Sequence, residues 1–169
     1  EIDAGGRFFD VMVARYGLSL DVVSGSLADI PRDGPVMFIA NHPYGILDGL
    51  MLGHMLSAAR SDFKIIANSV FRASPALNDH VLPIHFEQNK TAHAINIETR
   101  KAALAYLGQG GAIGVFPGGT VSTGATPFAR PMDPIWRSFA ARLIAKSGAI
   151  VVPIYFEGNT SRMFQIASH

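Results

Sequence analysis

The chain has 169 residues and a formal net charge of +1, and 49% of its residues are hydrophobic but only 16% are charged. An average soluble domain carries about 25% charged residues, so the surface of this one must be short of charge. The length fits one folded domain, and the composition excludes a disordered or fibrous chain. Lysine and arginine form no run longer than two residues, so we expect no nucleic-acid partner.

No apolar run approaches the roughly 18–20 residues that cross a bilayer, so any contact with a membrane is expected from one side. The sequence has no cysteine, which excludes disulfides and thiolate metal sites. It also lacks a His-Glu-x-x-His motif, and we predict no metal. Because the chain begins at Glu1 and has no leader, we expect residues 1–169 to be a single domain from a longer protein.

Short β-branched runs alternate with longer stretches of helical spacing, a pattern typical of an α/β domain. The expected strands are Val36–Ala40, Phe63–Ala67, Val81–Phe86, Ile113–Phe116 and Ile150–Phe156. Their almost continuous apolar character favours a mostly parallel or mixed central sheet that helices cover on both faces. The expected helices are Gly6–Tyr16, Leu47–Ala59, Ile97–Leu107 and Pro134–Lys146.

Polar and turn-forming residues indicate where some of these helices begin. Asn96 is expected to cap the third helix, and Asp133, directly before Pro134, to start the fourth. The stretch Phe71–Asp79 predicts a short helix that Pro75 interrupts.

Asn41, His42 and Asp48 follow the first expected strand, in a Pro/Gly turn that leads into a helix. Side chains in such a loop face the cleft beyond the carboxyl ends of the strands. Asp48 lies six positions after His42, close enough for its carboxylate to bind one ring nitrogen and leave the other as a general base. The alternative is structural, with His42 capping the turn and Asp48 capping the helix.

A second candidate site lies where the buried strand at 113–116 ends in a loop of small residues. Exposed backbone N–H groups in such a loop suit an oxyanion or a phosphate. The glycine pattern is not a dinucleotide-binding fingerprint, because Gly108, Gly110 and Gly111 precede a strand instead of following one. An ordinary strand-to-loop turn is the alternative. The candidate residues are Phe116, Pro117, Gly118, Gly119 and Thr120.

Three segments together resemble, in order and spacing, the sequence blocks of the glycerolipid and lysophospholipid acyltransferase superfamily. They are Asn41–Gly49, Phe116–Ser122 and Val151–Ile154, and the resemblance runs from about residue 35 to residue 161. It is closest to the haemolysin-like branch, which includes the acyltransferase portions of ornithine-lipid synthases, because five residues separate the histidine from the aspartate.

The resemblance implies transfer of a fatty acyl group from acyl-CoA or acyl carrier protein to a hydroxyl of a lysolipid or lipid precursor, with no further cofactor. His42 would remove the hydroxyl proton, and Asp48 would orient His42. Asn41 and the loop 116–120 would contact the substrates. Backbone N–H groups near Gly118 and Gly119, or around the His42 turn, would stabilise the oxyanion. The protein would act as a peripheral protein on the cytoplasmic side of a membrane.

Three positions depart from the family pattern. Gly118 stands where the usual block has glutamate, Val121 where it has arginine, and Phe86 at the family's other basic position. The resemblance associates these arginines with the acceptor's phosphate, so their absence favours an uncharged or zwitterionic acceptor. Arg72 is a candidate for a replacement cation. A thioester or ester hydrolase and an inactive lipid-binding module stay open as alternatives.

Overall fold

The computed structural model describes residues 7–87, 89–126 and 128–168. Within them, five strands form one sheet in the order β3-β2-β4-β1-β5, and every neighbouring pair is parallel. The strands are β1 (Val36–Ala40), β2 (Phe63–Asn68), β3 (Val81–Ile84), β4 (Ala112–Val115) and β5 (Ile150–Ile154). The α/β prediction is confirmed, with a sheet that is parallel throughout these residues.

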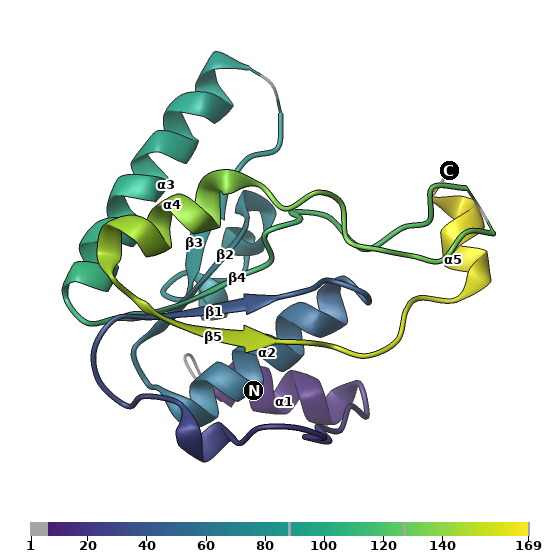
Figure 1. Ribbon diagram of the computed structural model, residues 1–169, viewed down its shortest axis with the longest axis horizontal. Helices are drawn as coiled ribbons and strands as arrows, with labels where there is room; N and C mark the ends of the chain where they lie inside the picture. Colours follow the sequence, from purple (N-terminus) through teal and green to yellow (C-terminus); the bar gives the residue numbers. More distant parts are fainter. Residues whose placement is uncertain (1–6, 88, 127, 169) are drawn as a thin grey trace.

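Helices cover both faces of the sheet (Figure 1). They are α1 (Arg7–Arg15), α2 (Ile46–Ala59), α3 (Lys90–Gly108), α4 (Ser138–Ser147) and α5 (Arg162–Ala167). On one face, α1 and α2 pack on Val36 and Phe38, and on the other, α3 and α4 pack on Met37 and Ile39. Successive residues of a strand point to opposite faces, so β1 must be apolar at every position, and all five of its residues are buried.

The starts of the third and fourth helices differ from the expected ones by four residues or more. The first helix is described from Arg7, and its expected start at Gly6 lies outside the described residues. The third begins at Lys90, seven residues early, because Asn89 caps it by accepting a hydrogen bond from the Ala92 N–H at 2.7 Å. Asn96 is therefore inside the helix, where its amide binds the backbone N–H and C=O of His85.

The fourth helix begins at Ser138 and not at Pro134, and Asp133 does not cap it. The stretch 71–79 falls in two short 3₁₀ helices, Ser69–Ala73 and Pro75–Leu77, because proline starts a new turn instead of continuing the old one. A further 3₁₀ turn spans Leu27–Asp29.

Between β4 and α4 the chain makes a long excursion, residues 116–137, away from the sheet. An antiparallel bridge between Thr123 and Met132 holds its two sides together. The short helix α5 lies beside it (Figure 1), and the buried Gln165 binds the Gly124 N–H at 2.9 Å and the Ser122 carbonyl at 3.2 Å. These hydrogen bonds tie the excursion to α5.

A buried arginine fixes the opposite edge of the sheet, where the strands begin. The Arg60 guanidinium donates to the carbonyls of Pro31, Gly34 and Gly110, which precede β1 and β4, and makes two hydrogen bonds of 2.7 Å to Asp62 ahead of β2. The hydrogen bond from Arg60 lowers the pKa of Asp62 below its ordinary value, and the same bond raises the pKa of Arg60. Arg60 therefore connects the amino ends of β1, β2 and β4 through hydrogen bonds.

Candidate active site

His42 and Asp48 lie side by side just beyond the carboxyl end of β1. The His42 Nδ1 atom is 3.1 Å from Asp48 Oδ2, and the carboxylate is only 2% exposed. The Asp48 carboxylate selects the tautomer with a proton on Nδ1, which leaves Nε2 as the basic nitrogen. The structure therefore brings together the two residues that the spacing predicted to pair.

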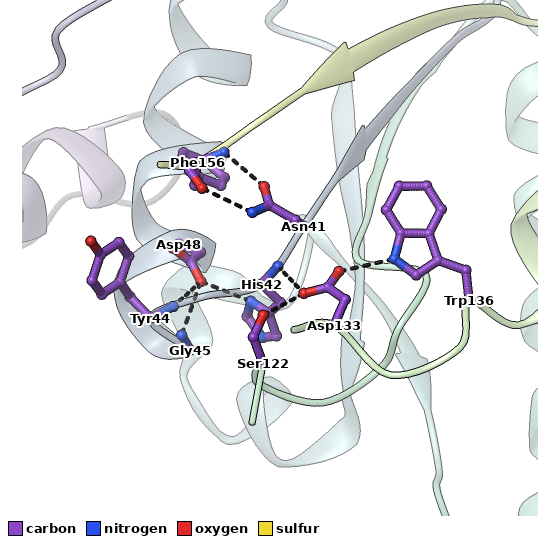
Figure 2. Close-up of polar contacts among 9 residues, drawn as sticks. All are labelled: Asn41, His42, Tyr44, Gly45, Asp48, Ser122, Asp133, Trp136 and Phe156. Carbon is purple, nitrogen blue, oxygen red and sulfur yellow. Dashed lines mark hydrogen bonds and ion pairs between the residues drawn. The ribbon is translucent and has the colours of Figure 1, made fainter. Parts of the chain in front are cut away.

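Asp48 also caps the turn that leads into α2. Its Oδ2 atom accepts hydrogen bonds from the backbone N–H groups of Tyr44, at 2.6 Å, and Gly45, at 2.9 Å (Figure 2). Gly45 adopts φ +72°, a left-handed conformation that glycine tolerates best. The structural and functional interpretations of Asp48 are thus compatible, because one oxygen both caps the helix and holds the histidine.

The His42 ring is fixed on a second side by Phe116, the first residue after β4. The two rings stack with centroids 4.0 Å apart and planes 23° apart. Since β4 is the neighbour of β1 in the sheet, the end of each strand delivers one ring of this pair. The side chain of His42 is 17% exposed, so solvent reaches a ring whose orientation is already fixed.

Asn41 has a structural role beside this pair. Its side-chain amide donates to the Phe156 carbonyl at 2.8 Å, and its oxygen accepts from the Phe156 N–H at 2.7 Å. These bonds continue the pairing of β1 and β5 beyond the last backbone partners. Both polar groups of the side chain are engaged in this way, which favours a structural role over the expected substrate contact.

The loop 116–120 begins beside His42, where the Phe116 ring stacks on the imidazole. Most of the backbone N–H groups expected to stabilise an oxyanion are already bound: that of Gly119 to Phe116 O at 3.0 Å, those of Tyr44 and Gly45 to Asp48, and that of His42 to Asp133. The N–H groups of Gly118 and Thr120 have no partner among the described residues. They are the donors that remain for an oxyanion at this loop.

A mainly apolar pocket opens next to the same loop, on the face covered by α3 and α4. Arg137 lies at its rim with the guanidinium carbon 5.7 Å from the Phe86 ring centroid. Sequence reasoning missed Arg137, because 51 positions separate it from Phe86 and no local pattern joins them. A cation therefore lies over the Phe86 ring. The residues lining the pocket include Ile66, Ile84, His85, Val115, Phe116, Pro117, Gly119, Arg137 and Phe139.

Arg72 is not brought to this site. It lines a separate open groove with Leu82, Pro83 and one side of α3. In the described part of the chain, no group of three or more histidine, aspartate or glutamate side chains is placed to hold a metal ion.

Asp133 is a second residue that sequence reasoning did not assign to the site. Instead of capping α4, its carboxylate accepts hydrogen bonds from the His42 N–H at 3.0 Å, from the Ser122 hydroxyl and from Trp136 Nε1 at 2.9 Å (Figure 2). The contact with His42 spans 91 positions, so nothing in the local sequence signals it.

The chain thus has a parallel sheet covered by helices, with a paired histidine and aspartate beyond the carboxyl end of β1. A family model described as "Acyltransferase" matches residues 6–169, and the chain belongs to this acyltransferase family. A search of curated proteins gives no match. Among the residues that the structure describes, no helix is long and apolar enough to span a membrane.

Proposed function

We propose that the protein is an O-acyltransferase that moves a fatty acyl group from an acyl thioester, acyl-CoA or acyl carrier protein, to a hydroxyl of a lysolipid or lipid precursor. The observation that carries the proposal is the 3.1 Å contact between His42 Nδ1 and Asp48 Oδ2 in a chain of an acyltransferase family. Within that family, we assign it to the haemolysin-like branch with the ornithine-lipid-synthase acyltransferases.

The proposed reaction needs one proton carrier. Nε2 of His42 accepts the proton of the acceptor hydroxyl while the hydroxyl oxygen bonds to the thioester carbonyl carbon, and the carbonyl electron pair moves onto its oxygen. The electron pair on the oxyanion then re-forms the C=O bond as the C–S bond breaks, and the leaving thiolate takes the proton from Nε2. The products are an ester and a free thiol. General-base assistance of this kind contributes about 10²- to 10⁴-fold.

The two developing charges have partners in the site. The Asp48 carboxylate stabilises the imidazolium through Nδ1, and the N–H groups of Gly118 and Thr120, which have no partner within the described part of the chain, are the donors we assign to the oxyanion. The apolar pocket beside Phe116 suits the start of an acyl chain.

For the acceptor, we propose an uncharged or zwitterionic lipid precursor. Gly118, Val121 and Phe86 stand at positions where the family pattern that the sequence resembles has charged residues. Arg137, over the Phe86 ring, supplies one cation at the pocket rim, which is enough for a single carboxylate or one half of a zwitterion.

We also propose that the protein works as a peripheral protein at the cytoplasmic surface of a membrane. The 116–137 excursion bears exposed apolar side chains at Met132, Ile135 and Trp136, and Ile135 is 95% exposed. Arg130 and Arg137 flank them in sequence. Apolar side chains with a tryptophan and nearby arginines are a combination that suits a lipid surface with anionic headgroups.

The test is release of free thiol from acyl-CoA and acyl carrier protein, with a panel of hydroxylated lipid acceptors that carry a phosphate, a zwitterion or no charge. Acceptor-dependent release together with an ester product, lost in His42→Ala, supports the proposal. Thiol release without any acceptor indicates a hydrolase. No release from either donor with any acceptor indicates an inactive lipid-binding module, and both of these outcomes contradict the proposal.

A further inference from the structure

We propose that Asp133 is a positioning residue of the active site, which holds the main chain of His42 so that Nε2 faces the substrate. The inference rests on the proposed function, in which His42 is the general base. It adds a second carboxylate to the site, one that acts on the backbone of the histidine and not on its ring.

A closed ring of hydrogen bonds carries the inference. The Asp133 Oδ1 atom accepts from the His42 N–H at 3.0 Å and from the Ser122 hydroxyl. Ser122 in turn donates its own N–H to the His42 carbonyl at 2.8 Å. Both main-chain polar groups of His42 are therefore bound to the excursion by two residues that are themselves bound to each other.

This ring of hydrogen bonds fixes the main chain of His42, which the contacts of its side chain do not fix. Asp48 holds Nδ1 and Phe116 covers one face of the imidazole, but both contacts depend on where the main chain places the Cα atom of His42. Asn41, before it, is tied to Phe156, and Pro43, after it, restricts the backbone of His42 itself. Asp133 and Ser122 fix the N–H and the C=O of His42 itself. This matters because a shift of about 1 Å at a reacting group can cost about 100-fold in rate.

The chemistry of the contact also favours a positioning role. A carboxylate that accepts from a backbone N–H forms a charge-assisted hydrogen bond, which is stronger than a neutral one. Ser122 is buried, so its hydroxyl needs an acceptor inside the protein. The second oxygen of Asp133 accepts from Trp136, which anchors the carboxylate from the side away from His42 (Figure 2).

The kinetic test compares Asp133→Ala, which removes the ring, with Asp133→Asn, which keeps an oxygen for His42 and Ser122 and loses the bond from Trp136. We expect Asp133→Ala to lower kcat about 10- to 100-fold with little change in KM, and Asp133→Asn to lose clearly less. Asp10→Ala is the matched control, because Asp10 also accepts a 2.7 Å bond from a histidine, His54, but on α1. Equal rates for wild type and Asp133→Ala would overturn the proposal.

A double variant separates positioning from folding. If Asp133 acts through His42, Asp133→Ala should not reduce the residual rate of His42→Ala any further. A full additional loss in the double variant would mean that Asp133 acts elsewhere. If Asp133→Ala does not fold, Ser122→Ala opens the same ring at its other member, and the same non-additivity with His42→Ala is expected.

Nuclear magnetic resonance gives a readout that does not depend on activity. The His42 Nδ1 proton, bound to Asp48, should give a slowly exchanging downfield signal in the wild type and in Asp10→Ala, and the signal should broaden in Asp133→Ala. A signal unchanged in Asp133→Ala contradicts the positioning role. If His42→Ala retains full transfer while the signal still broadens, the proposed function fails and the positioning of His42 stands.

Discussion

Replacing Asp48 by asparagine removes one negative charge from the His42 pair but keeps an oxygen acceptor of the same size. In the wild type, Oδ2 of Asp48 receives three hydrogen bonds, from His42 Nδ1 and from the N–H groups of Tyr44 and Gly45. An asparagine oxygen in the same place remains an acceptor for these donors, so the turn and the tautomer of His42 should both persist.

The expected loss is therefore the difference between a charge-assisted and a neutral hydrogen bond to the imidazolium. Hydrogen bonds to charged groups contribute about 1.5–3 kcal/mol and neutral ones about 1 kcal/mol, a difference of about 0.5–2 kcal/mol. Because each 1.36 kcal/mol changes the rate tenfold, Asp48→Asn should lower kcat about 2- to 30-fold. Asp48→Ala should lose more and also melt at a lower temperature, because it leaves two N–H groups of the turn without a partner.

The assay is acceptor-dependent thiol release at saturating thioester, with the melting temperature of each variant measured in parallel. Asp48→Asn should melt within a few degrees of the wild type. A wild-type rate in Asp48→Asn would refute the orienting role of Asp48. A large fall in the melting temperature of Asp48→Asn would refute the argument that the asparagine preserves the turn.

Three further predictions concern packing, pH and the membrane surface. In Gly53→Ala the new Cβ would clash with the ring of Phe9 on α1, so overpacking should lower stability by about 1–3 kcal/mol in a denaturant titration. Gly49→Ala, where a Cβ meets open space, should be neutral or stabilising. Arg60 lowers the pKa of Asp62, so their bond stabilises the fold above the unfolded pKa of about 4. This stabilisation is lost as the pH falls through the folded pKa. The difference in melting temperature between wild type and Asp62→Asn should therefore be present at pH 7 and shrink below about pH 4. Ile135→Ser should weaken co-sedimentation with anionic vesicles at an unchanged melting temperature, and equal co-sedimentation would refute the membrane role of this residue.

The parts of the fold that were predictable are those that local patterns determine. The apolar runs located all five strands, and the run at 36–40 correctly indicated a strand covered on both faces. The proximity of His42 and Asp48 was predictable too, because both belong to one strand-turn-helix unit only six positions apart. Their roles in catalysis stay a prediction.

The parts that were missed depend on contacts between distant segments. Asp133 and Pro134 form a good local signal for a helix start, but the carboxylate gains more hydrogen bonds by reaching back to His42 and Ser122. The cation over Phe86 comes from residue 137, and the amide of Asn41 is used by residue 156. Such pairings depend on where the 116–137 excursion and β5 return over the sheet, which no residue spacing encodes.

The central claim is that His42 is the base of an acyl transfer, and the rate of acceptor-dependent thiol release in His42→Ala tests it most directly. His54→Ala is the matched control, because the Nδ1 atom of His54 contacts Asp10 at 2.7 Å in the same manner but on the α1–α2 face. General-base catalysis predicts a loss of about 10²- to 10⁴-fold in His42→Ala and a rate close to wild type in His54→Ala. Undiminished transfer by His42→Ala would contradict the claim.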